Sequence, residues 1–492
     1  MGLTNYRLGK EVLKRVVSGI MVILWLTSVL ILALNIQPAK AIGIIYIRAE
    51  GSIDPPTANI ATIDNVTYTF TDNINDSIVV EKNDIVIDGA GYTLRGYVLE
   101  WGWESGSRGI DLTGRTNVTI QNMQIRNFND GIWLEGSSSN NINGNSLIKN
   151  GYGVRFQYSC NYNSVSRNNI TDGGIEFDYS SDYNIVFENS FTATYDVSIL
   201  LYGSSNNSIY GNNITNSLGS GGHGSVWLYE SSNNSIFGNN ITANSLNGIT
   251  VSYDSSYNSI HGNNITANGG GGIWLFWYSS CNNIYGNNIA NRGTYGILLT
   301  ESSTNNSIYE NKVANNSNGI SLATPNNTIY GNTIINNVDY GVCLIEASDN
   351  KFYHNSINNT QNVYDWSWRD PQYYSPSTNV WDDGYPSGGN YWMDYNGTDF
   401  FSGLYQNETG SDGIGDVPYV IDGNNADRYP LMLLRGDLNQ DGTVDIYDAI
   451  LAALAFGTYP GHPEWDPRVD LNQDDVIDIF DIIILATNFG RH

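Results

Sequence analysis

The sequence predicts an all-β chain, a parallel β-helix of about 12 coils, followed by a small all-α calcium-binding module. Two repeated patterns predict this arrangement. The phrase Asn-x-apolar-x-x-Asn occurs ten times between residues 140 and 355. A twelve-residue pattern of oxygen-bearing side chains occurs twice after residue 436. The first pattern indicates a stacked solenoid, and the second has the ligand spacing of calcium loops.

The spacing of the phrase indicates one coil per copy. Its second asparagine recurs every 21 to 27 residues, at Asn145, Asn168, Asn189, Asn212, Asn239, Asn263, Asn287, Asn311, Asn332 and Asn355. Flanking stretches such as Gly272-Ile273-Trp274-Leu275 alternate for only a few residues, which suits short strands and not helices. A unit this short cannot bury its apolar face alone, whereas units stacked about 4.8 Å apart do so together.

The asparagines suit both the turns and the stacking of such coils. Asn tolerates the left-handed backbone of sharp turns, and identical Asn amides one coil apart can hydrogen-bond in a ladder. An apolar residue stands at the third position of all ten copies, which argues against a low-complexity surface segment. Residues 83–89 and 117–122 look like two earlier coils, and we expect residues 42–80 to cover the exposed end of the solenoid.

The charge of the chain limits its partners. The formal net charge is −27, although only 14% of the residues are charged, and residues 1–41 sum to +4, so the rest of the chain is near −31. We therefore expect no nucleic acid partner and no binding to an anionic membrane surface. The charge also argues weakly against a polyanionic polysaccharide, unless calcium bridges the charges.

The N-terminal segment predicts export. Residues 16–36 are almost wholly apolar, and Ala39-Lys40-Ala41 resembles a signal-peptide cleavage site. We expect a secreted, extracellular protein, with an uncleaved membrane anchor as the alternative because the apolar run is long enough to span a bilayer. Triplets such as Asn206-Asn207-Ser208 permit glycosylation of an exported chain, although the repeat phrase generates such triplets by itself.

Candidate sugar-binding residues lie beside the Gly-Ile-x-Leu stretches. In a strand the residue after Ile points outward, as does the residue after Leu. These two outward columns contain large aromatic side chains suited to stacking on sugar rings, namely Trp133, Trp227, Trp274, Tyr229 and Phe276. Aromatic stacking that stabilises the sheet, or burial under a loop, is the alternative interpretation.

Candidate catalytic residues lie in the same columns. Glu176 and Asp178 stand two apart on one strand, roughly 7 Å from each other, which is within the range of glycosidase carboxylate pairs. Arg155 is expected directly below Glu176, so a surface ion pair is the simpler alternative. His223 lies in the longest repeat, where a Gly-His-Gly turn weakly resembles that of the polygalacturonase family.

The two C-terminal patterns predict calcium loops at residues 437–448 and 470–481. Each places ligands at loop positions 1, 3, 5, 7, 9 and 12, the seventh through a backbone carbonyl. The predicted ligands are Asp437, Asn439, Asp441, Thr443, Asp445 and Asp448 in the first loop, and Asp470, Asn472, Asp474, Val476, Asp478 and Asp481 in the second. A helix-like apolar run follows each loop, at residues 449–454 and 482–486.

Two calcium loops, each followed by one helix, resemble a type I dockerin over about residues 436–492. The resemblance implies two bound calcium ions and docking to a cohesin partner. Asp475 stands where Gly is expected, and Asp can adopt that left-handed turn. Loop positions 10 and 11 hold Ile446, Tyr447, Ile479 and Phe480 instead of hydroxyl residues, which favours an apolar partner surface, within or outside this chain.

The solenoid resembles NosD-like proteins, which are right-handed parallel β-helices of the carbohydrate-binding and sugar-hydrolase type with a pectin-lyase-like fold. The repeated phrase, residues 87–92 and the segments 388–395, 412–419 and 429–432 contribute to the resemblance, over about residues 45–434. Copper handling, which the family name implies, is not expected, because the few His, Cys and Met residues do not cluster.

These patterns predict four parts: a signal or anchor at residues 1–41, a β-helix at 42–365, its C-terminal cap at 366–434 and the dockerin-like module at 436–492. Two functions remain open. One is an enzyme acting on extracellular polysaccharide, either a glycoside hydrolase or a polysaccharide lyase. The other is a non-catalytic surface solenoid that presents a glycan- or protein-binding face.

Overall fold

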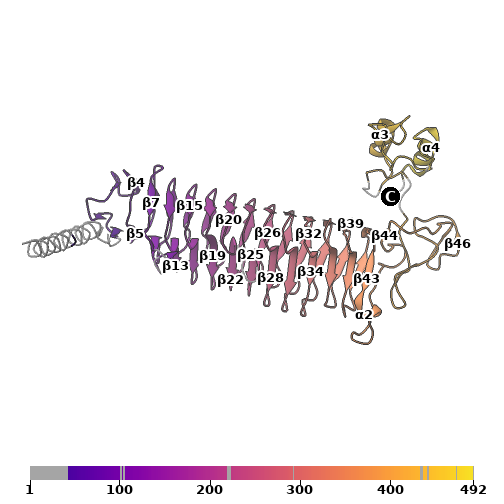
Figure 1. The fold of residues 1–492 in the computed structure, drawn as a ribbon, viewed down its shortest axis with the longest axis horizontal. Coiled ribbons are helices and arrows are strands. Elements are labelled where there is room, and N and C mark those ends of the chain that lie inside the picture. The colour runs from indigo at the N-terminus through magenta and orange to yellow at the C-terminus, as the bar shows by residue number, and fades with distance from the viewer. Residues whose placement is uncertain are drawn as a thin grey trace, which may run out of the picture. The chain divides into compact units, whose positions relative to one another are not determined.

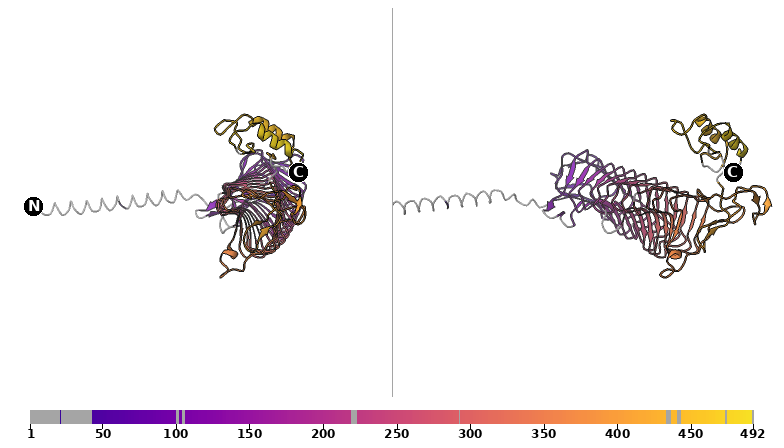
Figure 2. Two further views of the ribbon diagram at one scale, coloured as in Figure 1. Left: turned by 90° about the vertical axis from the view of Figure 1, so that its right-hand side faces the viewer. Right: turned by 45° about the vertical axis from the view of Figure 1, so that its right-hand side comes forward.

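The computed structural model describes residue 21 and residues 43–99, 102–103, 106–218, 223–291, 293–432, 436–439, 443–472 and 474–490. Three long sheets run along a stack of short coils (Figure 1). Viewed along the stack, successive coils lie over one another (Figure 2). The predicted parallel β-helix is confirmed as a β-solenoid of about 12 turns.

Each regular coil adds one strand to each of three sheets, which we name A, B and C. Among the described residues, sheet A has 15 strands in the order β2 (Ile53–Asp54), β1 (Ile44–Ile47), β5 (Ser77–Val80), β10 (Arg108–Asp111), β13 (Asp130–Glu135), β16 (Tyr152–Gln157), β19 (Gly174–Asp178), β22 (Ile199–Tyr202), β25 (Gly224–Tyr229), β28 (Asn247–Ser252), β31 (Gly271–Phe276), β34 (Tyr295–Leu299), β37 (Asn318–Leu322), β40 (Tyr340–Leu344) and β43 (Val363–Asp365). Sheet B, within the same residues, has 14 strands: β3 (Ile60–Ala61), β4 (Thr67–Phe70), β6 (Ile85–Asp88), β11 (Val118–Gln121), β14 (Asn141–Asn143), β17 (Ser164–Ser166), β20 (Ile185–Phe187), β23 (Ser208–Tyr210), β26 (Ser235–Phe237), β29 (Ser259–His261), β32 (Asn283–Tyr285), β35 (Ser307–Tyr309), β38 (Thr328–Tyr330) and β41 (Lys351–Tyr353).

Sheet C completes the coils. In the described part of the chain it has 13 strands, which from the N-terminal end are β7 (Thr93–Arg95), β12 (Gln124–Arg126), β15 (Ser146–Ile148), β18 (Asn169–Thr171), β21 (Ser190–Thr192), β24 (Asn213–Thr215), β27 (Asn240–Thr242), β30 (Asn264–Thr266), β33 (Asn288–Ala290), β36 (Lys312–Ala314), β39 (Thr333–Ile335), β42 (Ser356–Asn358) and β44 (Tyr391–Trp392). Three small antiparallel pairs lie outside the coils: β8 (Val98–Leu99) with β9 (Gly102–Trp103), β45 (Phe401–Ser402) with β46 (Glu408–Thr409), and β47 (Tyr419–Val420) with β48 (Ala426–Asp427).

The core is a set of apolar columns that run through the stack. In sheet B, for example, Ile209, Ile236 and Ile260 are in register and fully buried. The glycine of the Gly-Ile-x-Leu stretch is required by close packing of the coils. A Cβ on Gly272 would lie 2.3 Å from the carbonyl oxygen of Gly296 in the next coil, so only glycine fits there.

The predicted asparagine ladders are present. The Oδ1 atom of a typical ladder residue accepts both the main-chain N–H and the side-chain amide of its equivalent in the preceding coil. Asn263, for instance, donates from both groups to Asn287 Oδ1 at 3.0 Å, and Asn287 donates in the same way to Asn311. One ladder runs from Asn140 to Asn379 and the second from Asn145 to Asn390.

A third ladder was not predicted from the sequence. It follows sheet C and joins Asn244, Asn268, Asn291, Asn316, Asn337 and Asn359. All three ladders reach a carboxylate in the C-terminal cap. Asn390 donates to Asp427, Asn362 donates to Asp394, and Asn425, which accepts from Asn379, donates to Asp422.

The N-terminal region enters the sheets earlier than expected. Residues 42–80 were expected to cover the end of the solenoid, but β4 already pairs in parallel with β6, and β5 pairs in parallel with β10. Antiparallel strands β2 and β3 form the outer edge. The predicted apolar segment 16–36 lies outside the described residues apart from Met21. Within the part of the chain that the structure describes, no helix is long and apolar enough to cross a membrane.

In the described residues after the coils there are three short helices: α2 (Trp366–Arg369), α3 (Ile446–Ala455) and α4 (Ile479–Asn488). The last two coincide with the predicted helical runs. Asp445 and Asp478 cap them, each accepting an N–H of the first turn, and Asp448 and Asp481 complete a capping box. A separate small core, which includes Leu438, forms around these two helices.

Candidate functional site

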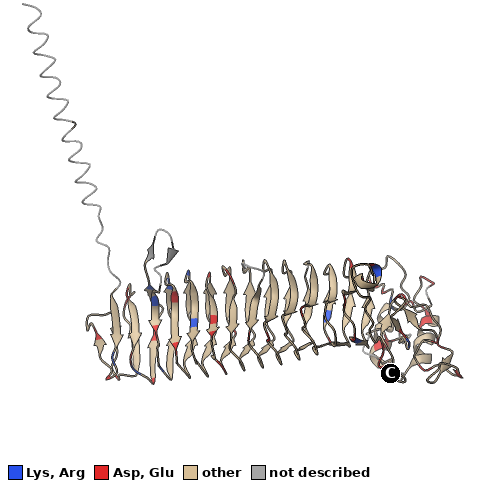
Figure 3. Cartoon of the chain, turned by 90° about the horizontal axis from the view of Figure 1, so that it is seen from below, with Lys and Arg blue, Asp and Glu red and all other residues tan. Residues whose placement is uncertain are grey.

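Charged side chains on sheet A gather in four consecutive coils. Strands β10, β13, β16 and β19 contain charged side chains, whereas the strands from β22 to β40, all of them described, contain none. Figure 3 shows this clustering of blue and red segments in the earlier coils. Isolated charged side chains on a solenoid are usually solvated surface groups. A cluster of ionisable side chains is a candidate functional site.

Arg155 lies at the centre of this cluster. It is in register with Glu176 in the next coil, as predicted. Its Nη2 atom lies 3.2 Å from Glu176 Oε1 and 3.8 Å from Asp178 Oδ2, so one guanidinium faces both carboxylates. Gln157 donates a further hydrogen bond to Asp178. Glu176 and Asp178 are 8% and 6% exposed, so this is a partly buried ion cluster rather than a solvated pair.

Burial sets the ionisation of the cluster. It raises the pKa of Glu176, and the positive charge of Arg155 partly opposes that shift. The pKa of Tyr152 rises to about 12 through burial and the charge of Glu176, which keeps the phenol protonated. Burial also raises the pKa of Asp130, whose Oδ1 atom has no hydrogen-bond partner among the described residues. A carboxylic acid with a raised pKa is suited to donate a proton near neutral pH.

Trp133 is less accessible than the sequence suggested. It occupies the expected outward column, but the guanidinium of Arg108 stacks 3.9 Å above its ring and leaves it only 6% exposed. Phe276 is likewise 5% exposed, because its ring packs 4.1 Å from that of Trp274. Phe276 therefore fits the alternative interpretation, aromatic stacking, whereas Trp133 is covered by an arginine side chain, which was not predicted.

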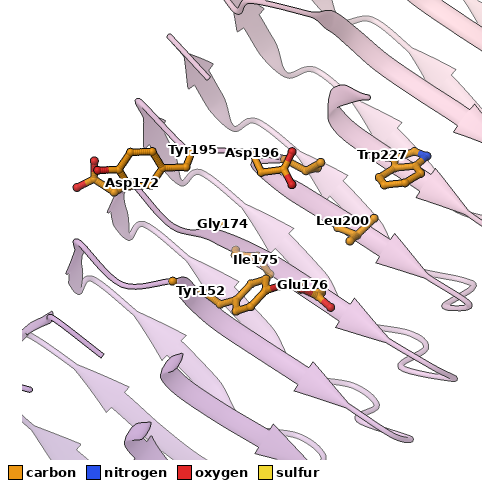
Figure 4. A pocket seen from close by; sticks show the side chains of 11 residues that line it. Tyr152, Asp172, Gly174, Ile175, Glu176, Tyr195, Asp196, Leu200 and Trp227 are labelled. Carbon is orange, nitrogen blue, oxygen red and sulfur yellow. The ribbon is translucent and has the colours of Figure 1, made fainter. Parts of the chain in front are cut away.

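A pocket of about 350 Å³ opens beside the charged cluster (Figure 4). Its floor comes from sheet A, where Glu176, Leu200 and Trp227 are consecutive in one column. The turn that precedes β22 contributes one wall, with Tyr195 and Asp196. The pocket is lined by Gly151, Tyr152, Asp172, Gly174, Ile175, Glu176, Tyr195, Asp196, Val197, Leu200 and Trp227.

Two other predicted site residues contact Trp227 beside this pocket. His223 stacks on Trp227 with ring centroids 3.6 Å apart, and burial lowers its pKa, which favours the neutral ring. Tyr229 meets the edge of Trp227, and the Trp227 indole donates to Ser252 at 2.9 Å. Trp274 lies two coils further along sheet A and does not line the pocket. The pocket is therefore lined by both Glu176 and Trp227. Arg155 contacts Glu176 and His223 contacts Trp227, so each of them adjoins the pocket through one lining residue.

Two features of the site were missed by sequence reasoning. Tyr195 and Asp196 lie in a turn between sheets, where no periodicity places a side chain. A continuous aromatic stack also follows sheet B, with centroids 4.6 to 5.2 Å apart, through Phe187, Tyr210, Phe237, His261, Tyr285, Tyr309, Tyr330 and Tyr353. Because each ring covers the face of the next, this stack stabilises the sheet and offers few free faces to a sugar.

The predicted calcium ligands lie in two loops that lead into the first turns of α3 and α4, except Asp441, which lies outside the described residues. In the second loop Asp470 accepts the N–H groups of Asp474 and Asp475 at 3.2 and 2.9 Å, which draws the loop into a tight turn. Asp475 has φ 65°, so it adopts the left-handed conformation usual for glycine. No cluster of three or more His, Cys, Asp or Glu side chains poised for a metal occurs among the described residues.

Family comparison agrees with this architecture. The model of the right-handed β-helix region matches residues 52–214 and 208–357, which together make up more than half of the chain. The chain belongs to the right-handed β-helix family. No curated protein matches it.

Several solved structures are similar to this family member. A periplasmic alginate epimerase, in a double-mutant form, is 16% identical with a TM-score of 0.42, over 62% of this chain and 80% of that one. A mannuronic acid-specific family 6 polysaccharide lyase from human gut microbiota is 14% identical with a TM-score of 0.43, over 67% and 88%. The Dettilon tailspike protein is 18% identical with a TM-score of 0.38, over 62% and 64%. These similarities concern the fold alone.

Proposed function

We propose that this β-helix protein binds an extracellular polysaccharide, with one sugar residue seated in the pocket between Tyr195, Glu176 and Trp227. The observation that supports this most directly is the composition of the pocket. An indole and two phenols stand beside carboxyl groups in a cavity of about 350 Å³. Aromatic rings pack against the apolar faces of a sugar, while carboxylates accept from its hydroxyl groups.

The charges favour a neutral or amino sugar over a uronic acid. Asp172, Asp196 and Glu176 line the pocket, whereas the guanidinium of Arg155 is held by Glu176 and Asp178. An anionic sugar would meet negative charge there, in a chain whose net charge is −27. A protonated amino group would instead gain from the same carboxylates.

Hydrolysis of the bound polysaccharide is the second candidate function, and the raised pKa of Glu176 favours it. In this role Glu176 donates its proton to the glycosidic oxygen as the bond from that oxygen to the anomeric carbon breaks, and Arg155 fixes the orientation of Glu176. Water then adds to the anomeric carbon and releases a proton to solvent, which restores the Glu176 carboxyl group. Asp178, which lies outside the pocket, helps to hold the Arg155 guanidinium in place beside Glu176.

A glycan array followed by reducing-sugar release distinguishes these functions. We expect the intact protein to bind a subset of neutral or amino-sugar glycans. Trp227→Ala should weaken binding about tenfold, the cost of losing one buried aromatic contact, while Trp274→Ala, outside the pocket, should not. Release of reducing ends that Glu176→Gln abolishes would establish hydrolysis. Binding to no glycan by the calcium-loaded chain would refute the proposal.

We further propose that the protein is exported through residues 1–41 and tethered through its C-terminal module. Calcium, when bound, would neutralise the acidic loops, and the residues to hold it are the oxygen ligands predicted from the loop spacing, with Asp470, Asn472 and Asp474 adjacent in the second loop. Ile446, Tyr447, Ile479 and Phe480 are 55 to 63% exposed, an apolar surface suited to a cohesin-like partner domain.

A further inference from the structure

Four asparagines with the same surroundings lie at the corner that precedes the strands of sheet B. They are Asn206, Asn233, Asn305 and Asn326, which we call the corner asparagines. Each has a left-handed backbone, with φ between 56° and 60°, and each is exposed. Each directly precedes a buried ladder asparagine, so its position is fixed by the coil on one side while its side chain projects into solvent.

The ladder does not require asparagine at this corner. Other coils place Ser139, Tyr162, Tyr183, Tyr257, Cys281 or Asp349 there, also with a left-handed backbone. In all four coils with a corner asparagine, the residue two positions later is Ser or Thr, namely Ser208, Ser235, Ser307 and Thr328. In the other six coils that position holds serine twice, and otherwise Asn141, Ile185, Asn283 and Lys351. The Asn-x-Ser/Thr triplet is therefore associated with the corner and is not dictated by the ladder.

The amides at the corner are also chemically available. Among the described residues no hydrogen bond engages the side chains of Asn206, Asn233 or Asn326, and Asn305 donates only to the neighbouring hydroxyl of Thr304. Two similar triplets in sheet C differ. Asn240 and Asn264 are half-buried, and their Nδ2 atoms donate to Asn213 and Asn240 at 2.7 and 2.8 Å. Their amides are held within a surface ladder between strands about 4.8 Å apart.

We propose that the corner asparagines are sites of N-linked glycosylation, and that Asn240 and Asn264 are not. In the reaction Nδ2 of the corner asparagine attacks the anomeric carbon of a lipid-linked oligosaccharide. The new C–N bond forms as the bond from that carbon to the lipid phosphate oxygen breaks, and the amide nitrogen loses one proton. A left-handed, convex corner presents the triplet to a transferase without unfolding the adjacent strands.

The test is peptide mass spectrometry of the full chain, recovered after export from a host that glycosylates its own exported proteins. Peptides with Asn206, Asn233, Asn305 and Asn326 should contain a saccharide, and those with Asn240 and Asn264 should have their unmodified masses. Combined Ser208→Ala, Ser235→Ala, Ser307→Ala and Thr328→Ala should remove the added mass, while leaving every ladder residue in place. Unmodified corner peptides, or equal modification of Asn240 and Asn264, would overturn the proposal, and circular dichroism of the combined variant verifies that it is folded.

Discussion

The carboxylate of Asp427 accepts the main-chain N–H of Asn390 at 2.7 Å, and so places a negative charge at the end of an asparagine ladder. In that ladder the main-chain N–H of Asn263, for example, points to the next coil, whereas its side-chain amide donates both to the next coil and back to the carbonyl of Ile236 in the coil before. At the C-terminal end of the ladder Asp427 accepts the main-chain and side-chain N–H groups of Asn390, which would otherwise have no next coil to donate to. Asp394 and Asp422 end the other two ladders by accepting the side-chain amides of Asn362 and Asn425, so each ladder ends on a carboxylate of the cap.

Asp427 should make the stability of the cap depend on pH. Burial raises its pKa to about 6, whereas an unfolded aspartate titrates near 4. At a pH between these two pKa values, Asp427 therefore holds a proton in the folded state and has lost it in the unfolded state. Protonated Asp427 therefore contributes its full stabilisation below about pH 4. As the pH rises through 6 this contribution is lost, and the free energy of unfolding falls by about 3 kcal/mol in total.

We expect the denaturant midpoint of the cap to fall between about pH 4 and pH 6.5, and Asp427→Asn to flatten that part of the curve. Tryptophan fluorescence reports on this region, because the Trp392 indole donates to Asp427 at 2.8 Å. Parallel pH curves for the two proteins would show that Asp427 does not titrate in this range.

The ladder residues should be far more costly to replace than their neighbours. Asn287→Ala removes the acceptor of two Asn263 donors and the donor to Ile260 and Asn311 within a fully buried site. Unsatisfied buried groups cost about 1–3 kcal/mol each. Asn288→Ala is the matched control, since Asn288 is exposed and its side chain donates only to Asn264. Urea unfolding followed by circular dichroism should show a lower midpoint for the first variant only, and equal midpoints would contradict a supporting role for the ladder.

Arg155 should be required for stability at neutral pH. Arg155→Met leaves Glu176 and Asp178 buried side by side with no guanidinium between them. Removing one partner from a buried ion cluster costs about 3–5 kcal/mol, and the cost here should be near the lower value because Arg155 is partly exposed. The loss should be smaller at acidic pH, because burial raises the pKa of Glu176 and this carboxyl group then takes up a proton. The triple variant with Glu176→Gln and Asp178→Asn should recover most of the stability, and failure to recover would indicate that Arg155 acts through packing.

The sequence predicted the solenoid because a ladder needs the same residue in every coil, and the phrase around Asn145 supplies it without a break. The third ladder was missed because Thr194 and Ser217 interrupt it. The register between neighbouring coils was equally predictable from the repeat, and it placed Arg155 beside Glu176. The pocket could not be predicted, because Tyr195 and Asp196 lie in a turn of irregular length and such turns follow no period. The contact in which Arg108 covers Trp133 also could not be predicted. It depends on how side chains of neighbouring coils pack, and the alternation of residues along one strand does not define that.

The C-terminal loops should bind calcium and depend on it for their structure. The second loop places the carboxylates of Asp470, Asp474 and Asp475 close together in the sequence, and Asp470 accepts the main-chain N–H groups of the other two. Asp475 adopts the left-handed backbone in this loop. Without a cation these carboxylates repel, so chelation should unfold α3 and α4 and leave the β-helix intact. Circular dichroism at the helical wavelengths should lose intensity on chelation and regain it with calcium. Asp470→Ala should weaken calcium binding measured by calorimetry, while Asp466→Ala, whose side chain pairs with Arg468 outside the loops, should bind as the parent does. A helical signal unchanged by chelation would exclude these loops as calcium sites.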